Sequence, residues 1–330
     1  MMNNEKKPLL QITNLSTYFF SFGGKRIVKA LDRVSFEVYE AEKIAIIGES
    51  GCGKSTLCFS ILQVLPPGAK VVGGKVIFEG ENLLEKNQKE MNKIRGKKIA
   101  MILQDSMVSL DPVFTIGEQI GETIRHHTSI KSVHIQEKII QLLLSFRISE
   151  PMKRAKQYPH ELSGGMRQRV VGAIALSCQP RILIADEPTT NLDVTIQLQY
   201  LNLLKEIQKN TGLTLLFITH NLGIVAELCE RVIVMYAGKI VEKSPVIDLF
   251  DTPFHPYTKA LLNSSFELGD LSKKAPIKGE PPDLANLPTG CNFHPRCIFK
   301  DKKCQMEDPP EIQLSQNRWV KCWKPLIDMK

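Results

Sequence analysis

The sequence predicts an α/β fold with a mainly parallel sheet that helices cover on both faces. Three apolar runs, KIAIIG at 43–48, RILIAD at 181–186 and TLLFIT at 214–219, each have the length of one buried strand. Segments with a helical spacing of apolar residues lie between these runs, and strands that alternate with helices are typical of parallel sheets. Glycine and charged residues bound the runs.

The N-terminal part of the chain adds an antiparallel β-subdomain to this prediction. Residues 9–20 and 28–40 have the composition of strands, and VVGGKVIFEGENL at 71–83 has the glycine turns of a hairpin. The run STLCFSILQVL, which follows Lys54, carries helix spacing and stops at a double proline.

An α-helical subdomain is expected at about 105–178. Residues 115–147 have helical spacing, and another helix is expected from Gly165 to about Cys178. The segment IQLQYLNLLKEIQKN then predicts one more helix before the run at 214–219.

The composition changes near residue 250. A proline-rich stretch occupies 273–290, and four of the eight cysteines fall between 291 and 322. We therefore expect a domain at 1–250 and a small cysteine-rich extension at 251–330.

Charge and hydropathy narrow the class of protein. The net charge of +8 comes from 43 basic residues interspersed with 35 acidic ones, without a basic block that contains aromatics, so we expect no nucleic-acid partner. No apolar run approaches the ~18–20 residues that cross a bilayer, and the start lacks the apolar core of a secretion signal. We expect a cytosolic or membrane-peripheral protein, in which eight cysteines indicate thiols or metal ligands.

The string GESGCGKST fits a phosphate-binding loop between a strand and a helix. Its glycines let backbone N–H groups turn toward phosphate, and the helix N-terminus adds partial positive charge. Lys54 is expected to reach the β- and γ-phosphates, and the hydroxyl of Ser55 to bind Mg²⁺. The full set of expected contacts is Gly48, Glu49, Ser50, Gly51, Cys52, Gly53, Lys54, Ser55 and Thr56.

Two carboxylates end the apolar run at 181–186. Asp186 stands where a carboxylate can hold Mg²⁺ through water. Glu187 follows and can polarise the attacking water as a general base. Taken alone, the pair could equally be a solvated turn.

With LSGGMRQR at 162–169 and ILIADEPTTNLD, the chain resembles the nucleotide-binding subunits of ABC transporters over residues 10–250. The resemblance implies ATP as substrate and Mg²⁺ as cofactor, with two ATPs held between two subunits. In it, Gln104 is the Q-loop glutamine beside Mg²⁺, Asp193 the D-loop aspartate and His220 the switch histidine at the γ-phosphate. Phe19, or Tyr18 beside it, would stack on adenine, although a place in the core is the alternative for both.

The resemblance also implies that the signature serves the ATP of a partner subunit. Those residues are Ser163, Gly164, Gly165 and Gln168. The strings YPHELSGGMRQRV and HPYTKALL are similar to the ATPases of oligopeptide, dipeptide and nickel importers. Met166 after the double glycine and the Thr-Thr pair after Glu-Pro resemble the D-type subunit of that group. This branch implies a homologous F-type ATPase as heterodimer partner, two transmembrane permease subunits and an extracellular or periplasmic substrate-binding protein. The chain would then be peripheral on the cytoplasmic side of the membrane.

The substrate stays open among peptides, nickel, metallophores and glutathione. A soluble ABC ATPase of ribosomes or DNA repair is the alternative from another class, but such proteins usually carry two cassettes or a long coiled-coil insertion, and this chain has one cassette.

The C-terminal cysteines form the last candidate site. Cys291, Cys297, Cys304 and Cys322 are not spaced as in common zinc ribbons. Four thiolates can hold a 4Fe–4S cluster or a tetrahedral Zn²⁺. The resemblance to D-type subunits favours the iron–sulfur cluster, while Zn²⁺ and unliganded thiols remain alternatives.

Overall fold

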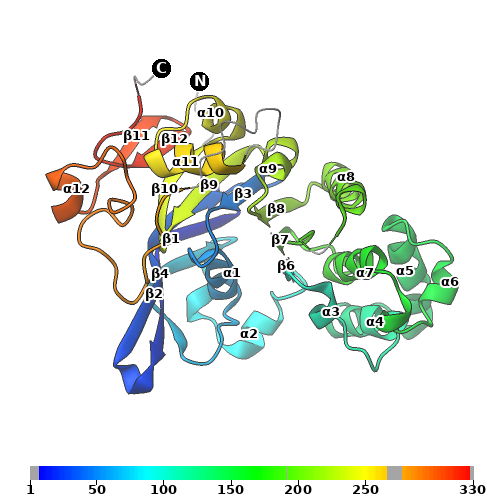
Figure 1. Cartoon of the computed structure of the whole chain (residues 1–330). Coiled ribbons are helices and arrows are strands. Elements are labelled where there is room, and N and C mark those ends of the chain that lie inside the picture. The colour runs from blue at the N-terminus through cyan, green and yellow to red at the C-terminus, as the bar shows by residue number, and fades with distance from the viewer. Residues whose placement is uncertain (1–6, 191, 266–276, 328–330) are drawn as a thin grey trace, which may run out of the picture. The chain divides into compact units, whose positions relative to one another are not determined.

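The computed structural model describes residues 7–190, 192–265 and 277–327 (Figure 1). The chain divides into two units, each with its own core. The first unit is made of Met1–Tyr39, Lys43–Glu85 and Ile218–Lys330, and the second of Glu40–Glu42 and Lys86–Phe217.

An antiparallel sheet occupies the N-terminal part of the first unit. Its strands lie in the order β2-β1-β4-β5. They are β1 (Leu10–Ser21), β2 (Arg26–Val38), β4 (Ala69–Phe78) and β5 (Glu81–Asn82). Leu10, Ile12 and, after an irregularity in the strand register, Leu15 of β1 are at most 2% exposed, as expected for a sheet with one buried face.

The second sheet of this unit places the phosphate-binding loop. Its strands follow the order β11-β12-β10-β9-β3, and β3 is parallel to β9 while the other pairs are antiparallel. They are β3 (Lys43–Ile47), β9 (Arg231–Tyr236), β10 (Lys239–Pro245), β11 (Glu311–Ser315) and β12 (Arg318–Lys321). The last four residues of β3 are fully buried, in agreement with its apolar sequence.

The helices of the first unit are short. They are α1 (Lys54–Leu62), α9 (Leu222–Leu228), α10 (Val246–Asp251), α11 (Pro256–Ser265) and α12 (Lys302–Met306). The C-terminal residues belong to this unit, because β12 pairs with β10 through Glu242–Val320 and Lys243–Trp319.

The second unit combines three strands with most of the helices. The strands β6 (Ile99–Ile102), β7 (Ile182–Asp186) and β8 (Thr214–Ile218) lie in the order β8-β7-β6, and β6 is parallel to β7. The helices are α2 (Gln88–Asn92), α3 (Ser106–Ser109), α4 (Ile116–His127), α5 (Ser132–Ser145), α6 (Pro151–Arg154), α7 (Gly164–Leu176) and α8 (Val194–Thr211).

Local sequence signals explain where the helices of the second unit begin. Thr115 and Glu118 form a capping box at α4, and the side chains of Ser163 and Asp193 cap α7 and α8. Each side chain accepts a backbone N–H of the first turn that would otherwise lack a partner. The sequence thereby fixes the first turn of two helices that carry candidate site residues.

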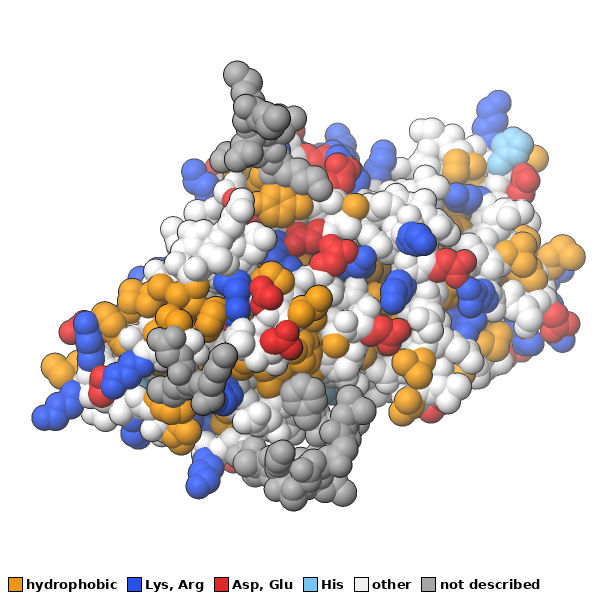
Figure 2. All heavy atoms as spheres, turned by 90° about the horizontal axis from the view of Figure 1, so that it is seen from above, with side chains coloured by type: hydrophobic (Ala, Val, Ile, Leu, Met, Phe, Trp, Pro, Cys, Tyr) orange, Lys and Arg blue, Asp and Glu red, His pale blue; other side chains and the backbone are white. Residues whose placement is uncertain are grey.

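The surface of the described residues matches the mixed charge of the sequence. Basic and acidic side chains are interspersed on the face drawn in Figure 2. Among the helices that the structure describes, none is both long and apolar enough to span a membrane.

Candidate functional site

The phosphate-binding loop joins β3 to α1 in the first unit, as predicted. Gly48 has φ 152°, and a Cβ there would lie 2.2 Å from the carbonyl oxygen of Met235. Gly53 has φ 107°, and a Cβ there would lie 2.4 Å from the carbonyl oxygen of Ala30. Both positions therefore require glycine, because another residue would be strained and would collide with backbone.

Lys54 reaches back over this loop from the first turn of α1. Its Nζ donates hydrogen bonds to the carbonyl oxygens of Gly48 at 2.7 Å and Glu49 at 3.0 Å. The residue is only 6% exposed. An ammonium held inside a loop of backbone amides is suited to bind a polyphosphate.

Cys52 lies inside the same loop and is 5% exposed. Burial is the main reason why the pKa of its thiol is raised above the ordinary value, although the charge of Lys54 opposes this. A thiol with a raised pKa is a poor nucleophile at neutral pH. We therefore interpret Cys52 as a small buried residue that packs inside the loop.

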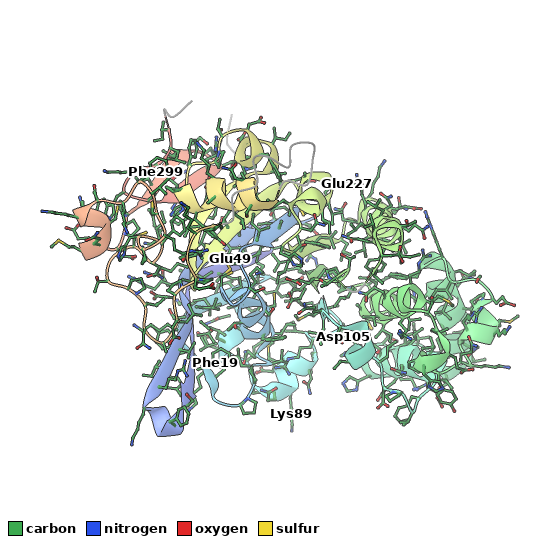
Figure 3. The ribbon with its side chains drawn as sticks, in the orientation of Figure 1. Phe19, Glu49, Lys89, Asp105, Glu227 and Phe299 are labelled. Atoms are coloured by element: carbon green, nitrogen blue, oxygen red, sulfur yellow. The ribbon has the colours of Figure 1, made fainter. Side chains whose placement is uncertain are left out.

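The two aromatic candidates for adenine lie on β1. Phe19 pairs with Val28 of β2 and Ala69 of β4 (Figure 3). Tyr18 and Phe19 are both half-buried. Neither belongs to the fully buried core, so stacking on a base remains open to both.

His220 also lies in the first unit, two residues after β8 ends. The N–H of Thr219 donates to the carbonyl oxygen of Ile46 at 3.3 Å, one residue before β3 ends. The next residue, His220, is exposed. Asn221 then caps α9 by accepting the N–H groups of Gly223 and Ile224. The histidine is therefore anchored on both sides near the carboxyl end of the strand that leads into the phosphate-binding loop.

The second unit brings Gln104 and Glu187 together. Nε2 of Gln104 donates to Oε2 of Glu187 at 3.1 Å, and the hydroxyl of Thr190 donates to the same oxygen at 3.1 Å. Asp186 precedes Glu187 as the last residue of β7 and is 5% exposed. Two donors on one oxygen fix the direction of the Glu187 carboxylate.

The backbone at Glu187 is strained. Its φ of 45° lies in the left-handed region, which costs a residue other than glycine roughly 1–3 kcal/mol. Strain of this kind persists where the surroundings impose it, and it is concentrated at active sites. Ten other described residues besides glycines also have a positive φ, so strain alone does not distinguish a general base from a solvated turn, and the role of Glu187 stays a prediction.

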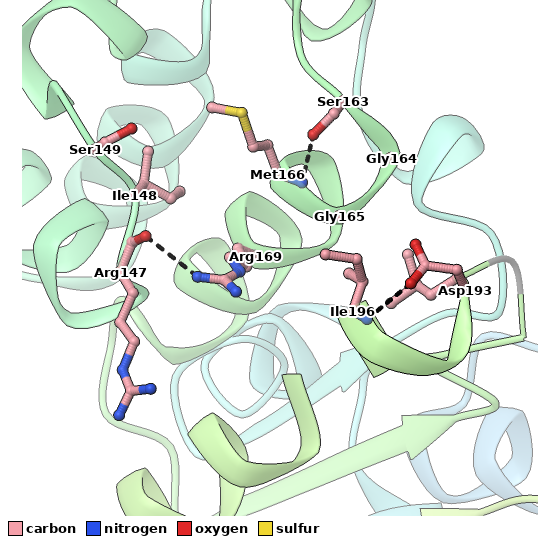
Figure 4. Close-up of a pocket in the computed structure, with 11 residues that line it drawn as sticks. Arg147, Ile148, Ser149, Ser163, Gly164, Gly165, Met166, Arg169, Asp193 and Ile196 are labelled. Carbon is pink, nitrogen blue, oxygen red and sulfur yellow. Dashed lines mark hydrogen bonds between the residues drawn. The ribbon is translucent and has the colours of Figure 1, made fainter. Parts of the chain in front are cut away.

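The signature residues form one wall of a pocket in the second unit (Figure 4). The pocket has a volume of about 370 Å³. Ser163 caps α7 by accepting the N–H of Met166 at 3.4 Å, and Asp193 caps α8 by accepting the N–H of Ile196 at 3.0 Å. The lining residues are Arg147, Ile148, Ser149, Ser163, Gly164, Gly165, Met166, Arg169, Leu192, Asp193 and Ile196.

The pocket depends on close packing of two helices. A Cβ on Gly165 would lie 2.7 Å from Cγ2 of Ile196, so α7 and α8 approach closely at this glycine. Gln168 does not line the pocket, because it is 3% exposed on the inner side of α7. The lining instead includes Arg169 and Arg147, which the sequence analysis missed. Arg169 was visible as a cation inside LSGGMRQR, whereas nothing in the sequence marked Arg147.

The four C-terminal cysteines are neighbours in the first unit. The N–H of Cys291 donates to the carbonyl oxygen of Cys304 at 2.9 Å. The pKa of Cys322 is raised to about 12, first by burial and then by Cys291, Cys297 and Cys304. All of these thiols are free. Within the described residues, however, no three or more His, Cys, Asp or Glu side chains are arranged to hold a metal ion.

Comparisons with known proteins place this chain among similar sequences. A family model described as ABC transporter matches residues 31–190, and one described as the C-terminal region of oligopeptide/dipeptide transporters matches residues 241–304. A probable peptide ABC transporter ATP-binding protein of Sinorhizobium fredii is 47% identical and covers 98% of this chain and 97% of its own. A dipeptide transport ATP-binding protein of Bacillus subtilis is 46% identical, with 96% and 94% covered.

A solved structure is similar as well. A dimeric ATP-binding cassette in a post-hydrolysis state, bound to ADP and Pi, has a TM-score of 0.64 and 27% identity. It covers 72% of this chain and 98% of its own.

Proposed function

This chain belongs to the ABC transporter family of ATP-binding subunits, and on that basis we propose that it hydrolyses ATP to drive the uptake of peptides. The observation that carries the ATPase is the phosphate-binding loop, in which buried Lys54 is held 2.7 Å from the carbonyl oxygen of Gly48. Peptides are proposed because the similar proteins of Sinorhizobium fredii and Bacillus subtilis are named for peptide and dipeptide transport.

In the proposed reaction, Glu187 accepts the proton of the water that attacks the γ-phosphate. Gln104 and Thr190 orient its carboxylate for this step. The family pattern assigns Mg²⁺ to Ser55, Gln104 and Asp186, and this ion supplies charge neutralisation on the phosphates. Lys54 also neutralises charge on the phosphates, from within the phosphate-binding loop.

Replacing the general base tests this reaction. Glu187→Gln keeps the size of the side chain and removes the proton acceptor, so ATP hydrolysis in the assembled transporter should fall by about 10²–10⁴-fold. Binding of MgATP to the purified chain should persist. Glu137→Gln, on an exposed side chain of α5, is the control. If Glu187→Gln retained the wild-type rate of hydrolysis, Glu187 would not be the base.

We also propose that the pocket beside Ser163 completes the ATP site of a partner subunit. The solved cassette that is similar to this chain is a dimer bound to ADP and Pi, which supports such an arrangement. Met166 follows the double glycine as in D-type subunits, so the proposed partner is a homologous F-type ATPase. We further propose that the chain assembles with two permease subunits and a substrate-binding protein. Its proposed location is peripheral, on the cytoplasmic side of the membrane.

For the C-terminal cysteines, we propose a 4Fe–4S cluster, with Zn²⁺ as the alternative. The four thiols are close enough for three of them to raise the pKa of the fourth, and thiolate donors suit either group. The described residues show no arranged metal group. Iron, sulfide and zinc analysis of anaerobically purified protein will decide among a cluster, Zn²⁺ and free thiols.

A further inference from the structure

Glu49, the second residue of the phosphate-binding loop, is labelled in Figure 3. Two residues from the C-terminal third of the chain, Tyr257 and Arg296, form hydrogen bonds with it. Its N–H donates to the hydroxyl of Tyr257 at 2.9 Å. Its carboxylate accepts two hydrogen bonds from the guanidinium of Arg296, at 2.6 Å and 3.0 Å. A bidentate pair of this kind fixes geometry as well as charge.

The guanidinium of Arg296 is itself rigidly placed. Its side chain is only 5% exposed, against 22% for Glu49. Nε donates to the carbonyl oxygen of Lys278 at 3.1 Å and Nη2 to that of Ile277 at 3.4 Å. Nη1 also donates to the hydroxyl of Tyr236 at 3.4 Å. The nitrogens of the guanidinium therefore have hydrogen-bond partners within the chain, without a bound nucleotide.

Aromatic packing holds the same segment against the body of the unit. The ring of Phe293 lies 5.2 Å from that of Tyr236 and 5.4 Å from that of Tyr257, centroid to centroid. Nδ2 of Asn292 donates to the carbonyl oxygen of Ala237 at 3.1 Å. Residues 292–296 thus behave as one anchored segment that delivers Arg296 to Glu49.

The charge of Glu49 is the reason why this contact matters. The carbonyl oxygen of Glu49 lies 3.0 Å from Nζ of Lys54, inside a loop that has to accept a polyanion. A bare carboxylate on a residue of this loop would repel phosphate, since like charges in a partly desolvated site interact strongly. The positive charge of Arg296 neutralises the Glu49 carboxylate and so removes this repulsion.

We propose that Arg296 is a positioning residue that neutralises Glu49 and thereby lets the C-terminal segment set the nucleotide affinity of the phosphate-binding loop. This inference rests on the proposed ATPase function. Arg296 acts through Glu49, and the C-terminal segment becomes a part of the nucleotide site.

A double-mutant cycle tests the inference on the full-length chain, with calorimetric titration of MgATP and MgADP. Arg296→Gln is expected to weaken nucleotide binding by about tenfold, the order expected for one exposed unit charge in a partly solvated site. In the Glu49→Gln background the same change should weaken binding by less than about threefold, because no charge remains to be neutralised. The tenfold defect should also shrink as salt screens the charge.

Arg26→Gln is the matched control. Arg26 pairs at 3.5 Å with Asp283, which lies outside the segment 292–296, and both partners are about half exposed. If Arg296→Gln does not fold, Arg296→Lys keeps the charge and should bind nucleotide within about threefold of wild type. An equal loss with and without Glu49, or no loss at all, would overturn the inference. Failure of the wild-type chain to bind nucleotide would instead refute the proposed function.

Discussion

At the scale of single residues, opposite charges at short range can lower the pKa of a carboxyl group. Asp308 shows this most clearly, since its carboxylate lies 2.8 Å from Nζ of Lys239 and 3.1 Å from Nζ of Lys321. Burial alone would raise its pKa, but the hydrogen bond and charge of Lys239 and the charge of Lys321 outweigh burial, and the pKa is lowered. Asp308 thereby ties β10 to β12.

Asp308→Asn should remove a pH-dependent part of the stability. Because the folded pKa is depressed, the stabilisation is fully present above the unfolded pKa of about 3.9 and is lost as pH falls through the folded pKa. We expect the variant to be less stable by about 1 kcal/mol at pH 7, a small value because the side chain is one-third exposed and screened. Urea denaturation at pH 7 and at pH 3 measures this. An equal deficit at both pH values would contradict the assignment.

At the scale of elements, helices α5, α7 and α8 pack around a glycine. A Cβ on Gly172 of α7 would lie 2.4 Å from Cε1 of Phe146 and 3.0 Å from the hydroxyl oxygen of Tyr200. Phe146 follows the last turn of α5 and is 1% exposed, and Tyr200 of α8 is fully buried. The small residue is what allows the two aromatic rings to approach α7.

Gly172→Ala therefore sets two effects against each other. Alanine favours the helix by about 1 kcal/mol, while overpacking a dense core costs about 1–3 kcal/mol. We expect a net loss of about 1 kcal/mol in the free energy of unfolding. Combining the change with Phe146→Leu makes room for the methyl group, so the two substitutions should be less damaging together than their sum. A Gly172→Ala variant more stable than wild type would show that the rings move aside.

Elements with local signals could be predicted from the sequence, and those that need distant partners could not. The helix at 116–127 carries its own capping box, and both it and the helix at 132–145 have apolar spacing, so the prediction of helices over 115–147 is confirmed. Strands β11 and β12 were not predicted, because a strand is stable only against its neighbour. The neighbour of β12 is β10, and Glu242 of β10 pairs with Val320 of β12, which is far away in the sequence.

The candidate site divides in the same way. The phosphate-binding loop was predictable because glycines impose its backbone and Lys54 lies within six residues of the carbonyl it contacts. The contact between Glu49 and Arg296 spans 247 residues and has no local signal. The burial of Gln168 could not be predicted for a related reason, since only the packing of α7 decides which side of that helix is buried.

At the scale of the whole molecule, each unit holds a candidate site of its own. The first unit holds a phosphate-binding loop with its own lysine. The second holds the pocket of about 370 Å³ beside Ser163. If that pocket serves a partner subunit, damage to it should leave nucleotide binding by the isolated chain intact and should stop hydrolysis only in the assembled transporter.

Substitutions of Ser163 separate this role from its role as a helix cap. Ser163 accepts the N–H of Met166, and aspartate caps a helix as well as serine does, whereas alanine loses about 1 kcal/mol. Ser163→Asp should therefore keep the stability of wild type, yet place a negative charge where the partner's phosphates would bind. Hydrolysis by the complex should fall at least tenfold for Ser163→Asp and less for Ser163→Ala, as measured by phosphate release. If hydrolysis instead followed thermal stability, with Ser163→Ala the worse variant, the residue would be a cap and nothing more.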